Sequence, residues 1–188
     1  MKKLILTISM VTFSVLGVFA QVSGGLKAGV NLANQRYEGD IFTAASDART
    51  GFHAGGYLNI GFGDKFSIQP ELLYNSVGAK LSNTDFKTDY LSIPVMLKFS
   101  PAPIFNFHFG PQFGFLMSAK FDGVDVRNDY KDIDLGLGVG IGVDLPLGLG
   151  VSARYVFGLA NIYADDVSNA KVTNTAFQIS ATLRLFGG

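Results

Sequence analysis

The chain has 188 residues, enough for one domain, and contains no cysteine, which excludes disulfides, thiolate metal sites and cysteine nucleophiles. Its 15 basic and 15 acidic residues balance, so the composition does not indicate a nucleic-acid partner. Hydrophobic residues make up 48% of the chain and charged residues only 16%, against roughly 25% charged in an ordinary soluble domain, so we expect apolar surface that faces something other than water.

Residues 1–20 have the pattern of a secretory signal peptide. Two lysines precede a short apolar stretch, and Val18 and Ala20 place small residues at the −3 and −1 positions before Gln21. The alternative is a transmembrane helix, but the stretch is shorter than the roughly 20 apolar residues that a spanning helix needs and is diluted by hydroxyl side chains. We expect export, cleavage after Ala20 and a mature domain of residues 21–188.

The rest of the chain alternates between apolar residues and polar or small residues along eight segments. In the fifth segment, for example, Phe105, Phe107 and Phe109 alternate with Asn106 and His108. A period of two predicts a β-strand with one apolar face. The predicted strands are 26–32, 52–62, 66–75, 90–99, 105–117, 134–144, 149–159 and 177–185.

The connections between these strands alternate between short and long. Tight turns are expected at 63–64, 101–103 and 146–148, and longer polar connections at 34–49, 79–88, 119–131 and 163–173. Short periplasmic turns and long outer loops are typical of barrels in a bacterial outer membrane. Since an open sheet in lipid would leave its edges unpaired, the predicted fold is all-β, an eight-stranded antiparallel up-and-down transmembrane barrel.

A soluble eight-stranded barrel of the lipocalin type is the main alternative, with its apolar face inside and its polar face in water. Most of the phenylalanines lie on the apolar face and are too bulky for the bore of a small barrel. The opposite face is rich in Gly, Ser, Asn and Gln, which suits a bore that side chains just fill. We therefore expect the apolar face to point outward to lipid.

Ionisable side chains on the predicted inner face must find partners, because a charge buried in a barrel is costly alone. The inward carboxylates are Glu71, Asp134 and Asp144, and the inward cations are Lys27, Lys98, Arg154 and Arg184. Five of them are expected to form one ionic network across the bore, namely Glu71, Lys98, Asp144, Arg154 and Arg184. Such a network is either a structural lock or the gate of a selective pore.

No catalytic, cofactor-binding or metal site is predicted. His53 and His108 lie at different heights, too far apart to share a metal or form a dyad, and are expected to fill the bore. Pro70, Pro94 and Pro111 fall at about one height on three successive strands. Because proline donates no ladder hydrogen bond, we expect bulges or missing ladder bonds there, which either supply curvature or weaken the seam.

Three segments carry a family resemblance. The run YLSIPVMLK at 90–98 resembles the YLEIPLLLK strand of the PorT-like outer-membrane β-barrel family of Bacteroidetes, and 110–120 and 134–162 resemble later strands of that family. The resemblance implies an outer-membrane location and, through the founding member, a link to secretion. It also implies that a C-terminal aromatic residue is read by the barrel insertion machinery. Here that residue is Phe186, although two glycines follow it and it is out of phase with Leu183 and Leu185.

Together these patterns predict a non-enzymatic outer-membrane barrel, structural or accessory to envelope transport, whose partners are membrane lipid and the insertion machinery. Three alternatives remain open: an adhesin-like binding protein, a lipid-modifying enzyme using His53 as base with a loop acid such as Asp47, and a small channel. For the first alternative, the candidate outer-loop contacts are Tyr37, Phe42, Phe86, Phe121, Tyr130 and Tyr163.

Overall fold

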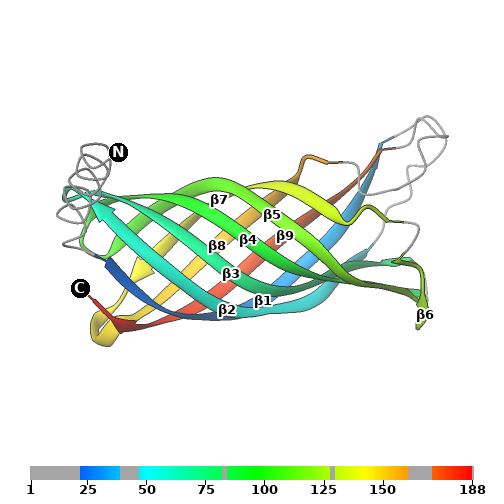
Figure 1. Cartoon of the computed structure of the whole chain (residues 1–188), viewed down its shortest axis with the longest axis horizontal. Coiled ribbons are helices and arrows are strands. Elements are labelled where there is room, and N and C mark those ends of the chain that lie inside the picture. The colour runs from blue at the N-terminus through cyan, green and yellow to red at the C-terminus, as the bar shows by residue number, and fades with distance from the viewer. Residues whose placement is uncertain (1–21, 39–46, 82–83, 128–129, 161–170, 188) are drawn as a thin grey trace, which may run out of the picture.

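The computed structural model describes residues 22–38, 47–81, 84–127, 130–160 and 171–187 and shows a cylinder of tilted antiparallel strands (Figure 1). None of the helices in these ranges is long and apolar enough to cross a membrane. The strands are β1 (Val22–Glu38), β2 (Asp47–Phe62), β3 (Phe66–Leu81), β4 (Thr84–Ala102), β5 (Phe105–Phe121), the two-residue β6 (Val124–Asp125), β7 (Ile133–Asp144), β8 (Leu149–Gly158) and β9 (Lys171–Phe186).

The sheet closes on itself. Neighbours follow the order β4-β3-β2-β1-β9-β8-β7-β5, and β4 also pairs with β5, so the ring of eight long strands has no open edge. The first and last strands meet along a ladder from Gly24 opposite Phe186 to Glu38 opposite Lys171. The predicted eight-stranded up-and-down barrel is confirmed, with β6 as a short addition to β5.

The apolar face points outward. Phe107, Phe109 and Ile141 are 53%, 54% and 58% exposed, whereas Glu71 and Arg154 on the opposite face are 3% and 2% exposed. Along β5 the exposed and buried residues alternate from Phe105 to Met117, as a period-two strand requires. A soluble barrel of the lipocalin type is therefore excluded, because its apolar side chains would lie inside.

Strand β1 begins and β9 ends at the same end of the barrel, which we call the turn end (Figure 1). The short connections lie there, between β2 and β3, between β4 and β5, and around the 3-10 turn Pro146–Gly148. Gly63 and Gly148 take positive φ values of 71° and 76° in two of these turns, a region open to glycine at little cost.

One predicted long connection, 79–88, was wrong, and the strands beside the other three extend into the residues that were predicted as loops. Residues 79–88 are almost entirely strand, since Leu81 at the end of β3 pairs with Thr84 at the start of β4. Residues 119–121 complete β5, and the chain reverses at Asp122-Gly123 so that β6 pairs back on β5. The polar residues of these segments look like loops in sequence because the strands run past the apolar band, where neither face needs to be apolar. Residues 39–46 and 161–170 lie outside the described part of the chain.

Strand pairing is interrupted beside each of the three prolines, without a change of register. The β2–β3 ladder skips from Tyr57–Glu71 to Ile60–Ile68, the β3–β4 ladder from Pro70–Val95 to Leu73–Ser92, and the β4–β5 ladder from Pro94–Gln112 to Leu97–Phe109. The β5–β7 ladder continues unbroken past Pro111. The expected missing ladder pairs are therefore confirmed on three neighbouring ladders, and they are gaps rather than bulges.

A β-bulge explains why Phe186 is out of phase in the sequence. Arg184 pairs with Gly25 and Phe186 pairs with Gly24, so Leu185 is the extra residue on β9. The bulge returns Phe186 to the outward face, where it is 53% exposed and its ring lies against Gly24.

Candidate functional site

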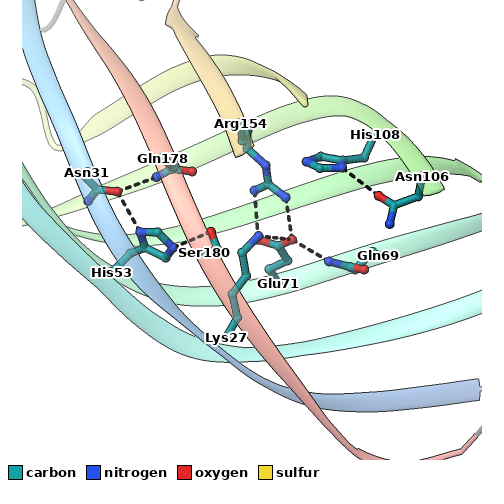
Figure 2. A network of polar contacts seen from close by, with 10 residues as sticks. All are labelled: Lys27, Asn31, His53, Gln69, Glu71, Asn106, His108, Arg154, Gln178 and Ser180. Atoms are coloured by element: carbon teal, nitrogen blue, oxygen red, sulfur yellow. Dashed lines mark hydrogen bonds and ion pairs between the residues drawn. The ribbon is translucent and has the colours of Figure 1, made fainter. Parts of the chain in front are cut away.

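The candidate site is the polar interior of the barrel, and its centre is the carboxylate of Glu71 on β3. Arg154 on β8 donates two hydrogen bonds to it, Nη1 to Oε2 at 3.0 Å and Nη2 to Oε1 at 2.7 Å (Figure 2). In the closed ring β3 and β8 are four strands apart, so this bidentate pair crosses the bore. Both side chains are at most 2% exposed, which makes the pair a strong and specific one.

Lys27 on β1 is a second cation on the same carboxylate. Its Nζ lies 3.0 Å from Oε1 and 3.1 Å from Oε2 of Glu71, and Gln69 Nε2 donates to Oε1 at 2.8 Å. We call Lys27, Gln69, Glu71 and Arg154 the central cluster. The sequence placed Lys27 on the inner face but left it out of the network, because nothing in the sequence shows that β1 brings it to the height of Glu71.

The structure divides the five residues expected in one network into two pairs and one separate residue. Glu71 and Arg154 meet in the central cluster, whereas Lys98 and Asp144 form a separate pair with Nζ and Oδ2 3.7 Å apart. Asp144 also accepts a 2.8 Å hydrogen bond from Asn106 Nδ2. Arg184 lines a cavity at the turn end and makes no ion pair with any residue that the structure describes.

A hydrogen-bonded chain of Ser180, His53 and Asn31 lies on the side of the central cluster away from Asn106 and His108 (Figure 2). Ser180 Oγ is 2.8 Å from His53 Nε2, and His53 Nδ1 is 2.7 Å from Asn31 Oδ1. Asn31 Nδ2 donates to the Ser76 carbonyl, so its Oδ1 is the acceptor. His53 therefore carries its proton on Nδ1, and its Nε2 accepts the Ser180 hydroxyl hydrogen.

This chain has the connectivity of a nucleophile, base and orienting group, but it is closed to a substrate. Asn31, His53 and Ser180 are at most 2% exposed. Ser180 lines neither the turn-end cavity nor either of two smaller cavities in the bore. Gln178 Nε2 donates to Asn31 Oδ1 at 3.1 Å, so the group forms a bore-filling polar network.

The two histidines lie on opposite sides of the central cluster, as expected (Figure 2). His108 Nδ1 is 3.2 Å from Asn106 Oδ1. Among the residues that the structure describes, no group of three or more His, Asp or Glu side chains could hold a metal ion.

Apolar side chains pack together near the outer end of the bore, and we call them the outer cluster. Its buried members, Ala33, Val77, Tyr90, Leu116, Ala119 and Ala176, are joined by Val126 and Tyr130 from the segment after β6. Tyr90 and Asp134 also accept hydrogen bonds from Asn174, at 3.3 and 2.8 Å. Tyr130 is partly buried against this cluster, and its role as an outer-loop contact stays a prediction.

The other predicted outer contacts are described only in part. Phe121 ends β5 and is 44% exposed. The backbone of Tyr37 lies in β1 and that of Phe86 in β4, opposite Phe121. Phe42 and Tyr163 lie outside the described residues.

Comparison with solved structures identifies the architecture. The attachment invasion locus protein Ail of Yersinia pestis matches with a TM-score of 0.54 at 13% identity, over 88% of this chain and 99% of that one. Neisserial surface protein A matches with a TM-score of 0.56 at 16% identity, over 86% and 97%. Because the sequence identities are low, these structural matches show a shared fold alone. A comparison with curated proteins found none that match.

The sequence itself matches the family model described as "Outer membrane protein beta-barrel domain" over residues 19–164. That match covers most of the chain and agrees with the closed ring, the outward apolar face and the polar interior. The chain belongs to the outer membrane protein beta-barrel domain family.

Proposed function

We propose that this protein is a non-enzymatic, non-conducting barrel of the outer membrane that serves as a structural or accessory component of envelope transport. One observation carries the proposal: the Glu71–Arg154 pair, reinforced by Lys27, crosses the bore from β3 to β8. The outer cluster closes the same bore again nearer the outer end. An eight-stranded barrel is just wide enough to be filled by side chains, so two closed levels leave no path for ions.

The experiment is single-channel recording of the refolded protein in planar bilayers. We expect no discrete conductance steps above those of the bare bilayer, with a wide porin as the positive control. Regular steps from the folded barrel would contradict the proposal and support the channel alternative.

The finer family assignment rests on the segment 90–98, and we propose that the chain belongs to the PorT-like branch of Bacteroidetes outer-membrane barrels. A role as an accessory in secretion follows from that resemblance. Deletion of the gene should then reduce the amounts of proteins in the culture supernatant while other outer-membrane proteins are unchanged. An unaltered supernatant would contradict the accessory role.

Export and assembly complete the proposal. The signal peptide at 1–20 is removed after Ala20, so the mature protein should begin at Gln21, which intact-mass measurement of the membrane-extracted protein checks. The partners are membrane lipid, which covers the outward apolar face, and the barrel insertion machinery, which reads Phe186 on the last strand.

A second candidate function is binding at the outer end, favoured by the β5–β6 hairpin. Phe121 and Val124 on this hairpin are 44% and 66% exposed, on strands that pair with each other beyond the bore. Exposed apolar residues at a protruding tip suit contact with another surface. Cells expressing Phe121→Ser/Val124→Ser should adhere less to a host-matrix coat than wild-type cells if binding is the function, and equally if it is not.

A further inference from the structure

At the turn end, the bore widens into a cavity of about 330 Å³. Its inner wall is polar, and its rim is formed by the short turns around Ile104 and Pro146. We call it the vestibule, and its polar lining residues are Ser23, Tyr57, Asn59, Gln69, Lys98, Asp144, Thr182 and Arg184. In an outer-membrane barrel the end with the short turns faces the periplasm, so the vestibule opens to periplasmic solutes.

The vestibule has an excess of positive charge. Lys98 and Arg184 line it against the single carboxylate of Asp144. The 3.7 Å separation of Lys98 Nζ and Asp144 Oδ2 exceeds hydrogen-bond length, so that pair leaves the ammonium donors of Lys98 available. Arg184 has no ion-pair partner among the described residues, and its guanidinium presents a fork suited to a carboxylate or phosphate.

Charged residues deeper in the bore add to this excess of positive charge. In the central cluster two buried cations, Lys27 and Arg154, share one carboxylate, that of Glu71. A smaller cavity of about 40 Å³ lies between the two regions, because its lining includes Lys27 and Arg154 as well as Lys98 and Asp144. Among the described residues of the vestibule and the central cluster, these four cations face two carboxylates, those of Asp144 and Glu71, so the turn-end part of the bore is attractive to an anion.

Two buried polar groups without a partner in the described part of the chain line the smaller cavity. His108 is 5% exposed and Arg154 is 2% exposed, and both line the smaller cavity. Neither His108 Nε2 nor Arg154 Nε has a hydrogen-bond partner among the residues that the structure describes. Buried polar groups in native proteins nearly always have a partner, so these two groups are suited to water that fills the smaller cavity next to the vestibule.

We propose that the vestibule binds a small hydroxylated anion of the periplasm, a sugar acid or a sugar phosphate. Arg184 and Lys98 hold the acidic group. The hydroxyl and amide side chains of Tyr57, Asn59 and Thr182 surround the rest of the molecule and match a ligand rich in hydroxyl groups. The volume is at the lower end of the range for small-molecule sites, which fits a monosaccharide. This inference goes beyond the proposed structural role, since a barrel that does not conduct can still hold a ligand at one end.

Isothermal titration calorimetry of the refolded full-length mature barrel, in an uncharged polyoxyethylene detergent, tests the proposal. The probes are glucuronate, glucose 6-phosphate, inorganic phosphate and neutral glucose. We expect one-site binding of glucuronate or glucose 6-phosphate with a dissociation constant below about 1 mM, and binding of glucose weaker by about tenfold or more. If inorganic phosphate binds as tightly as either sugar anion, the claim that the vestibule recognises the sugar is wrong. No saturable binding, or equal binding of glucose, would overturn it.

Three variants locate the site. Arg184→Gln and Lys98→Gln should each weaken binding of the sugar anion by about tenfold, because each removes a charge-assisted contact. Asp144→Asn should strengthen binding by about threefold, because it removes the competing carboxylate. Lys120→Gln, at an exposed position near the outer end of β5, is the matched control and should have no effect.

Folding of every variant is checked by heat-dependent electrophoretic mobility. Amide chemical shifts of the wild-type barrel give a readout that needs no variant: on addition of glucuronate, shifts should change at Gln69, Thr182 and Arg184. Shift changes confined to the outer end, or unchanged affinity in Arg184→Gln, would place the anion elsewhere and overturn the proposal.

Discussion

The carboxylate of Glu71 receives hydrogen bonds from three side chains on three strands, Lys27 on β1, Gln69 on β3 itself and Arg154 on β8. A fully buried carboxylate is tolerated only when such partners replace its lost hydration. If the carboxylate is removed, two buried cations remain without a counter-charge. Loss of Glu71 should therefore lower the free energy of unfolding more than loss of either cation does.

Glu71→Ala should lower the free energy of unfolding by about 3–5 kcal/mol, the cost of breaking a buried pair on one side. Denaturant unfolding in lipid vesicles measures this, with Asp64→Ala in an exposed turn as the control. A loss no greater than in the control would mean that water reaches the charges and that the bore is open.

Ser180 provides a chemical test of the closed interior. It contacts His53 with nucleophile–base geometry but is 2% exposed, so a fluorophosphonate probe should not label it in the folded barrel. Mass spectrometry of the probed protein measures the labelling. Modification of Ser180 in the folded protein, together with its loss in His53→Ala, would revive the enzyme alternative.

At the residue scale, the sequence predicted which face of a strand each side chain lies on. It predicted less well which side chains contact one another. Alternation placed Lys27, Glu71 and Arg154 on the inner face, and all three are there. It did not separate Lys98 and Asp144 from the central cluster, because the height of a residue depends on the register of every ladder between the strands concerned. The Asn31–His53–Ser180 network was missed for the same reason, since it joins β1, β2 and β9.

At the scale of elements, the gaps beside Pro70, Pro94 and Pro111 form a weak diagonal across β2, β3, β4 and β5. Proline lacks the N–H that a ladder needs, and its neighbours lose their pairing as well. The other side of the barrel is continuous, since the β7–β8 and β8–β9 ladders run without a break. The two halves of the barrel wall should therefore differ in local stability.

Hydrogen exchange followed by NMR should show this difference. Amides beside the gaps, at Leu72, Ile93, Met96 and Gly110, should exchange faster than those of Val139, Ala153 and Ile179 in the unbroken ladders. Equal protection in the two sets would mean that the gaps do not weaken the wall and that the prolines only supply curvature.

The bulge at Leu185 leads to a prediction about assembly. If the insertion machinery reads an outward aromatic residue at the end of β9, Phe186→Ala should reduce the fraction of folded barrel in cells. Deletion of Leu185 should leave that fraction unchanged, because Phe186 then follows Arg184 directly and still lies on the outward face opposite Gly24. Leu185→Ala, which keeps the bulge, is the control for both. Normal accumulation of folded Phe186→Ala would contradict the role of Phe186.

The sequence predicted the elements well inside the apolar band and less well outside it. The tight turns and all eight long strands agree with the structure, because alternation is enforced where one face is apolar. Beyond the band, residues such as Lys80, Asp85 and Lys87 extend the β3–β4 ladder without an apolar face. Period two then disappears from the sequence although the backbone pairing continues, which is why 79–88 looked like a loop.

On the scale of the whole molecule, the barrel reverses the arrangement of a soluble protein. Its phenylalanines form the outer surface, while its amides, histidines and ion pairs fill the inside. Aromatic pairs such as Phe66–Phe99, with ring centroids 5.0 Å apart, lie on the outer wall. This arrangement is stable only where lipid covers the wall. Under the proposed function, the central and outer clusters separate the two sides of the membrane.

Spin-label accessibility tests this account most directly, and the absence of native cysteine allows single labels at Phe109→Cys and Gln112→Cys. Phe109 is 54% exposed on the outer wall, whereas Gln112 is 9% exposed inside the bore. In vesicles, the label at 109 should be relaxed by oxygen dissolved in lipid, and the label at 112 should be protected from both oxygen and a water-soluble nickel complex. A label at 109 shielded from lipid would contradict the orientation of the wall, and a label at 112 open to the nickel complex would contradict the closed bore.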